Sequence, residues 1–288
     1  SGRKEKEGNE IAKGDGSTEV CSSDLDGEEN KTVLESGTGN SGSGFTITRK
    51  PASGKKAPKQ GTFTQCAATD GRWSVYPGAQ TTYAVTASSS ALGFGAGAFT
   101  IEFWIYNQGS AGNQWLIDFR TSGSSTNPWL ILNSSNQLTY GVGSSFLKTT
   151  VGTVPTHAWT HIALVKDTGG TVKFYINGTA DANTYADSNN FGASQRAAIC
   201  TFGDAIGGAN GVVFSYLSNL RIATSAVYTA GFTPSTSPLS ATGAAFLTFT
   251  SNRIYDQSSN GIAITSYGGI KVTPFSPFAP TAAYSASV

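Results

Sequence analysis

The feature that most constrains this chain is a regular alternation of apolar and polar residues over two long segments, Ala98–Tyr106 and Ala158–Thr179. Because the side chains of a strand point to opposite faces in turn, every second residue of such a segment shares one face. In the first segment one face is wholly apolar and consists of Phe99, Ile101, Phe103 and Ile105. The pattern predicts long strands of an antiparallel sheet, each with one face in a hydrophobic core.

The second segment also contains turn chemistry. Asp167–Gly170 separates two alternating runs, and Asn177-Gly178 follows the second run with the dipeptide that best tolerates the positive φ angles of a type I′ turn. From Phe45 onward the chain continues as short strand-like runs between Gly, Asn, Asp, Ser and Pro, without apolar residues at helical spacing. We therefore predict an all-β fold, a two-sheet antiparallel jelly-roll sandwich.

Four regions are expected along the chain. Residues 1–44 hold ten acids and five bases without apolar periodicity, so they are expected to be disordered. Part of this region, 14–25, resembles translated read-through of a sequencing adapter, and an ordinary polar linker is the alternative. Residues 66–280 are expected to form the jelly roll. Because Gly44–Thr48 matches Gly261–Thr265, residues 45–65 are interpreted as a linker or the end of a preceding repeat, and 281–288 as a linker or the start of another.

Composition argues against several classes of function. Charged residues make up only 13% of the chain, and the basic cluster at 49–59 has no interleaved aromatic stripe, so nucleic-acid binding is not favoured. No run of apolar residues is long enough to predict a membrane span. Cys21, Cys66 and Cys200 are too few and too widely spaced for a disulfide framework. Cys200 is expected to be buried, and its pairing with Cys66 is left open.

Six motifs between Gly71 and Phe278, including those in the two segments described above, together resemble the pattern of a single family. They are FTIEFWIY, HAWTHIALVKD, VKFYINGT, LSNLRIATSAVYTAGFTPSTSPL, FLTFTSNRIYDQSSNGIAIT and VTPFSPF. They resemble the concanavalin A-like, laminin-G-type jelly rolls found in tandem in structural proteins of marine tailed bacteriophages. The resemblance implies a virion location and a recognition module that contacts surface glycans or other virion proteins. A structural spacer or decoration domain, and a secreted bacterial adhesin, are the alternatives, because one fold hosts many activities.

Catalysis is not expected. Glucanases with this general fold need two carboxylates, presented as Glu-x-Asp-x-x-Glu on one strand. Glu102 is the only Glu beyond position 35 and has no acidic residue two or five positions away. His157 and His161 are four residues apart on a predicted strand, which is not the spacing of a helical metal pair. We expect His161 to be a packed, hydrogen-bonded residue and Arg221 to bond backbone carbonyls of a neighbouring loop.

The jelly-roll lectins that this sequence resembles usually bind ligands on the loops at one edge of the sandwich, so the resemblance implies a ligand site there. Two tryptophans flank a Ser/Asn-rich loop, and the proposed ligand-binding residues are Trp115, Trp129, Asn113 and Asn127. The segment 181–190 is interpreted as a polar loop. Its side-chain oxygens make calcium the candidate ion, on Asp181, Asn183, Asp187 and Asn189, with Asn190 beside them. A solvated hairpin loop is the alternative interpretation of this composition, and no other cofactor is predicted.

Overall fold

The computed structural model describes residues 71–109, 112–122, 125–203 and 212–278, together with strands β1 (Phe45–Ile47) and β2 (Gly61–Phe63). These two strands pair antiparallel within a first unit, Ser1–Ala67. The second unit, Ala68–Val288, contains all other strands. The predictions made for residues 1–44 and 281–288 lie outside the described residues, and the origin of residues 45–65 stays a prediction.

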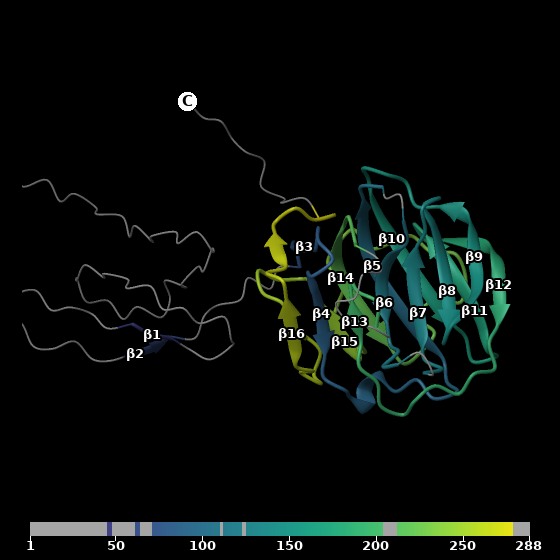
Figure 1. The fold of residues 1–288 in the computed structure, drawn as a ribbon, viewed down its shortest axis with the longest axis horizontal. Helices are drawn as coiled ribbons and strands as arrows, with labels where there is room; N and C mark the ends of the chain where they lie inside the picture. The colour runs from purple at the N-terminus through teal and green to yellow at the C-terminus, as the bar shows by residue number, and fades with distance from the viewer. Residues whose placement is uncertain are drawn as a thin grey trace, which may run out of the picture. The chain divides into compact units, whose positions relative to one another are not determined.

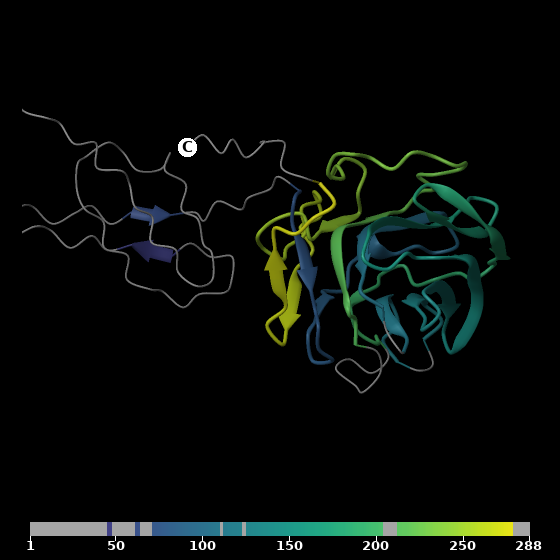
Figure 2. The same ribbon diagram turned by 90° about the horizontal axis from the view of Figure 1, so that it is seen from above.

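The second unit is a sandwich of two antiparallel sheets, as predicted (Figures 1 and 2). The larger sheet has the strand order β12-β11-β10-β5-β14-β3-β17, with β15 paired to β14. Its strands are β3 (Ser74–Tyr76), β5 (Phe99–Asn107), β10 (Trp159–Lys166), β11 (Thr171–Ile176), β12 (Thr179–Ala186), β14 (Ser215–Ala223), β15 (Phe246–Thr248) and β17 (Lys271–Thr273).

The second sheet has seven strands in the order β16-β4-β13-β6-β7-β8-β9. They are β4 (Tyr83–Thr86), β6 (Gln114–Asp118), β7 (Pro128–Leu132), β8 (Gln137–Val142), β9 (Ser145–Thr153), β13 (Ala198–Ile199) and β16 (Ile264–Tyr267). One 3₁₀ turn, Ser90–Leu92, is the only helical element among the described residues. None of the described residues forms an apolar helix long enough to cross a bilayer.

The core lies between the sheets and follows the predicted alternation. The apolar face of β5 is at most 1% exposed, and its register sets Phe103 opposite Ile162 and Ile101 opposite Leu164 on β10. Leucines of β7 and β8 and the Tyr140 ring complete the same cluster from the seven-stranded sheet. Since apolar burial stabilises by about 25 cal/mol per Å², this shared face is the main source of the sandwich's stability.

The opposite face of β5 is also covered, which the alternation did not predict. Tyr228 and Phe232, in the connection after β14, pack against apolar residues of β10 and β11. Near the C-terminal end of the described chain, Phe275 contacts Tyr106 and Phe278 contacts Trp104. These two connections lie on the outer face of the eight-stranded sheet and bury polar residues that an open sheet would expose.

The turn at Asn177-Gly178 is confirmed. Both residues have positive φ, 49° and 75°, as a type I′ turn requires, and they connect β11 to β12. A Cβ on Gly178 would lie 1.8 Å from the carbonyl oxygen of Phe232, so only glycine fits beneath this connection.

Strands β9 and β12 were not predicted, and the interpretation of 181–190 as a loop is wrong for its first six residues. Both strands lie at sheet edges, and β12 alternates exposed and half-buried residues without a strong apolar face. Their contacts are made across the edge of the sandwich. Asp181 on β12 accepts hydrogen bonds from the N–H groups of Val151 and Gly152 on β9. These side-chain hydrogen bonds join β9 and β12, two edge strands that belong to different sheets and are not paired through their backbones.

Candidate functional site

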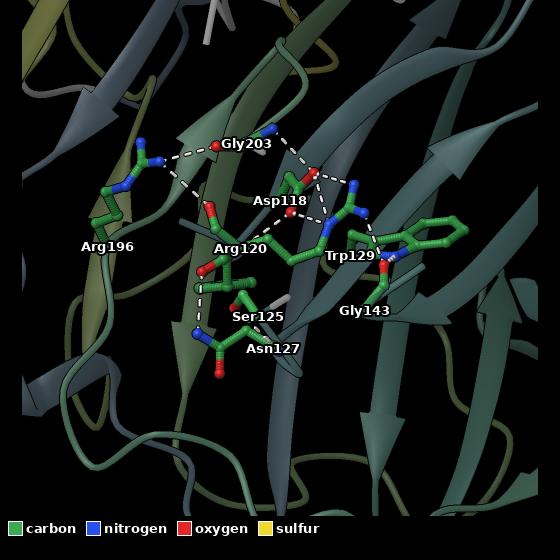
Figure 3. A network of polar contacts seen from close by, with 9 residues as sticks. Asp118, Arg120, Ser125, Asn127, Trp129, Gly143, Arg196 and Gly203 are labelled. Carbon is green, nitrogen blue, oxygen red and sulfur yellow. Dashed lines mark hydrogen bonds and ion pairs between the residues drawn. The ribbon is translucent and has the colours of Figure 1, made fainter. Parts of the chain in front are cut away.

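A buried ion pair forms the centre of the candidate site. Asp118 is the last residue of β6, and Arg120 follows in the connection to β7. The guanidinium donates to the carboxylate in a bidentate geometry, with Nε 3.0 Å from Oδ1 and Nη2 2.6 Å from Oδ2 (Figure 3). Asp118 is fully buried and Arg120 is 3% exposed. A planar fork of donors matched to a carboxylate suits such a water-excluded place.

Three aromatic rings surround the guanidinium. Its central carbon lies 5.0, 5.4 and 4.6 Å from the ring centres of Trp115, Trp129 and Phe202, within the range of cation–π attraction. The indole ring of Trp129 packs directly on Gly141, the residue opposite it in the β7–β8 register. A Cβ at Gly141 would come within 1.9 Å of the indole, so the ring can occupy this position only because residue 141 is glycine.

The same ion pair holds three connections at one edge of the seven-stranded sheet. Arg120 Nη1 and Trp129 Nε1 both donate to the carbonyl of Gly143, at 2.6 and 2.9 Å. The N–H of Gly203 donates to Asp118, and Arg196 donates to the carbonyls of Gly203 and Arg120 (Figure 3). Backbone groups before β7, after β8 and after β13 are therefore anchored to one buried charge pair. We call this place the loop edge.

The solvent side of the loop edge carries one prominent aromatic ring. Phe146, at the start of β9, is 61% exposed and lies edge-on against Trp129, with ring centres 4.6 Å apart. Exposed hydroxyl-bearing residues lie nearby: Thr126 and Ser144 on the adjacent connections, and Ser145 at the first position of β9. The loop edge thus combines a rigid buried base with an exposed ring and neutral polar groups.

The structure brings together only part of the predicted ligand set. Trp115 and Trp129 are in contact, with ring centres 5.0 Å apart, but they are 6% and 1% exposed and support the surface rather than form it. Asn127 lies at the same edge, where its amide donates to the Phe119 carbonyl. Asn113 is exposed but precedes β6, at the opposite end of the β6–β7 pair.

The four predicted calcium ligands do not converge. Asp181 is near the start of β12 and Asp187 follows its end, six residues along an extended strand, which separates them by about 20 Å. Both Asp181 oxygens accept backbone N–H groups of β9, and Asn183 donates to the Thr149 carbonyl, so this pair holds the two edge strands together. Within the described residues, no three His, Cys, Asp or Glu side chains gather as a metal site.

Asp187 belongs to a different buried group. It accepts hydrogen bonds from the Tyr140 hydroxyl and the Asn189 side chain, and Lys166 Nζ lies 4.0 Å away. Burial, followed by the bond to Asp187, raises the pKa of Tyr140 far above its usual range. The group links β8 of one sheet to β10 of the other, so its role is to hold the sandwich together.

Calcium at millimolar concentration is therefore expected to leave the thermal midpoint of the metal-free protein unchanged. Binding to the native state alone would raise the midpoint with concentration. Asp181 and Asp187 cannot share an ion, and each already accepts protein donors. Scanning calorimetry of EDTA-treated protein, with magnesium as the control ion, tests this. A midpoint that rises with calcium but not with magnesium would contradict it.

A second polar cluster was missed by the sequence analysis. Glu102, on the outer face of β5, is fully buried and accepts from Arg221 Nε and the Tyr228 hydroxyl, each at 2.7 Å. His161 Nε2 lies 3.1 Å from Oε2, the oxygen that also accepts from Tyr228, whereas Arg221 donates to Oε1. His161 is packed and hydrogen-bonded as predicted. Burial alone would raise the pKa of Glu102, but His161, Arg221 and Tyr228 together lower it.

The prediction for Arg221 names only its minor contact, because its main partner lies on a neighbouring strand of the sheet. Its main partner is the Glu102 carboxylate, opposite it in the β14–β5 register, and the Ser240 carbonyl is a longer second contact at 3.4 Å. A signal was present, since Glu102 is the only charged residue of its strand and must be paired if it is buried. Which base pairs with it depends on strand order, and strand order is not visible in sequence.

Two solved structures are similar to this chain. A proposed carbohydrate-binding protein from Bacteroides ovatus matches with a TM-score of 0.51 and 14% identity, over 70% of this chain and 59% of that protein. A heptameric SAP-like pentraxin from Limulus polyphemus matches with a TM-score of 0.45 and 17% identity, over 69% of this chain and 93% of the pentraxin. At these identities the likeness concerns the fold alone. No curated protein matched the chain.

A family model described as the concanavalin A-like lectin/glucanases superfamily, of laminin-G type, matches residues 77–231. The match begins before β4 and ends in the connection after β14. It therefore includes β5, β10 and the whole of the loop edge, and it spans more than half of the 288 residues. This chain belongs to the concanavalin A-like lectin/glucanase superfamily.

Proposed function

We propose that this chain is a non-catalytic recognition module of a tailed-phage virion or fibre protein and that it contacts glycans at a host surface through the loop edge. The phage context rests on the resemblance of its six sequence motifs. Glycan recognition is supported by the family and by the proposed role of the Bacteroides ovatus protein of similar fold.

The observation that carries the proposal is that the exposed Phe146 ring packs against Trp129, a side chain that is already fixed in place. Its neighbour Trp129 is held by Gly143 and by the buried Arg120 guanidinium. A binding surface that is ordered before the ligand arrives loses little conformational entropy on binding. An aromatic ring beside neutral hydroxyl groups suits a sugar, because a sugar has an apolar C–H face and hydroxyl edges.

A hydrolytic role is disfavoured because the carboxylates already form hydrogen bonds or ion pairs with other groups of the protein. Glu102 is buried with three partners, and Asp118 is paired with Arg120. Asp256 accepts from the N–H groups of Leu247 and Ile262 and so organises a turn. All three carboxylates are buried, whereas glycoside hydrolysis requires two carboxylates that flank the bound substrate.

Replacing Phe146 with alanine is expected to lower glycan binding at least tenfold and to leave the thermal midpoint within a few degrees. The ring is mostly exposed, so its removal costs little folding free energy, whereas a stacking ring carries a large share of the binding energy. A glycan array with the full chain identifies the ligand, and calorimetric titration compares the variants.

Val151→Ala is the matched control, since Val151 is a 63% exposed apolar residue of the same strand. Its binding should equal that of the parent protein. If the parent protein binds no glycan on the array, the proposal fails and the spacer interpretation takes its place. A Phe146→Ala variant with full affinity would remove the loop edge as the contact surface.

A further inference from the structure

A pocket of about 480 Å³ lies over the outer face of the eight-stranded sheet, on elements that do not contribute to the loop edge. Its base is Trp104 on β5. One side is formed by the connection after β14, at Pro234–Thr236, and another by Pro277 and Phe278 at the end of the described chain. The depression is open to solvent, so it suits a ligand that lies along the surface.

The apolar part of the lining is rigid. Trp104 is half-buried and lies edge-on to His161 on one side and to Phe278 on the other, with ring centres 5.3 and 5.7 Å away. Pro234 and Pro277 have fixed φ angles and add flat apolar walls. The pocket therefore offers ring faces and edges that need no reordering when a ligand binds.

The polar part of the lining is neutral. Exposed Asn177 is oriented by its Oδ1, which accepts from the N–H of His161, and its amide group remains available as a donor. Ser235 and Thr236 are exposed at the rim. The Ser235 hydroxyl donates to the carbonyl of Ser237 and accepts from its N–H, which fixes this part of the rim, and the Thr236 hydroxyl is the group that faces a ligand. None of the lining residues is charged.

The charges beneath the pocket compensate one another. The Glu102 carboxylate accepts from Arg221 and Tyr228 and lies against His161, the residue that contacts Trp104. An anionic or cationic ligand would lose hydration here without gaining a partner of opposite charge. A neutral ligand with an apolar face and several hydroxyl groups matches both halves of the lining.

We infer that this pocket is a second ligand site, which binds the ring of an uncharged pyranose through stacking on Trp104 and hydrogen bonds to Asn177 and Thr236. The inference goes beyond the proposed function because the site lies on the other sheet. Contact with a glycan through the loop edge does not require it.

The experiment blocks the pocket without altering the core. Thr236 is exposed on a connection, so Thr236→Trp should fill the rim and leave the thermal midpoint within about two degrees. Thr242→Trp adds the same ring at an exposed position outside the pocket and is the control. Both are made in the full chain and titrated with neutral gluco-, galacto- and manno-oligosaccharides, with sialylated and sulfated glycans as the charged comparison.

The expected result is that at least one neutral oligosaccharide shows a binding step that Thr236→Trp weakens tenfold or more and that Thr242→Trp leaves unchanged. This step should remain in Phe146→Ala, which removes only the separate step at the loop edge. Neutral binding that survives Thr236→Trp but is lost with Phe146→Ala would overturn this inference and leave the proposed function standing. Binding of charged glycans only, or of a proline-rich peptide in place of sugars, would also overturn the inference. Failure of the array with every glycan would overturn both proposals.

Discussion

Replacing Asp118 with asparagine is expected to lower the free energy of unfolding by about 3–5 kcal/mol, the range seen when one partner of a buried ion pair is removed. Asp118 and Arg120 are both excluded from water, and the variant leaves the guanidinium buried without a counter-charge. The Gly203 N–H also loses a charged acceptor. Urea denaturation followed by circular dichroism measures the effect.

The double variant Asp118→Asn/Arg120→Met is the internal control for this prediction. Methionine keeps apolar contact with the rings around position 120 and removes the uncompensated charge. If the charge pair is responsible, the double variant should be less destabilised than the sum of the single variants, because residues in contact are not additive. If the losses in unfolding free energy are additive, or if Asp118→Asn alone loses less than about 1 kcal/mol, the ion pair is not a major source of stability.

Glu102→Gln is expected to destabilise the protein by about 3 kcal/mol at neutral pH and to change how stability depends on acid. The loss arises because the Arg221 guanidinium keeps its position beside a side chain that no longer carries the compensating charge, and His161 loses its carboxylate partner. Tyr228 also loses an ionised acceptor, and Tyr228 belongs to the connection that covers this face of the sheet.

The pH dependence follows from the lowered pKa of Glu102, whose ordinary value is 4.5. A carboxyl group with a lower pKa in the folded state contributes stability above its unfolded pKa. That contribution is lost as the pH falls below about 4.5 toward the lowered folded value. The curves for the parent protein and for Glu102→Gln should therefore be well separated at pH 7 and converge below pH 4.5.

Denaturation at pH steps between about 3 and 7 tests this convergence, since the ordinary carboxyl range lies inside it. Lys271→Gln, which removes a charge from an exposed residue of β17, is the control and should track the parent protein throughout. A constant separation between the Glu102→Gln and parent curves down to pH 3 would show that the ionised carboxylate is not the source of the stability.

The sequence by itself determined the all-β class of the fold and the direction of the buried faces of its long central strands. Alternation in β5 and β10 identified the residues that point into the core, because the period of a strand is a local property of the backbone. Asn177-Gly178 identified its turn for the same reason, since positive φ depends on the residue itself. The family followed from motifs spread along these local elements.

Tertiary structure alone decided the roles of the polar and aromatic residues. Trp115 and Trp129 have the composition of a binding platform, but Phe202 and Phe146 cover them, and both come from distant segments. Asp181 and Asp187 are close in sequence and lie at different ends of an edge strand, where each is engaged by its own neighbours. Edge strands such as β12 lack a strong apolar face, so their periodicity is weak until a partner edge is present. The periodicity of a strand depends on consecutive residues. Whether a side chain is covered, which residue it pairs with and how exposed it is depend on which distant strands become neighbours.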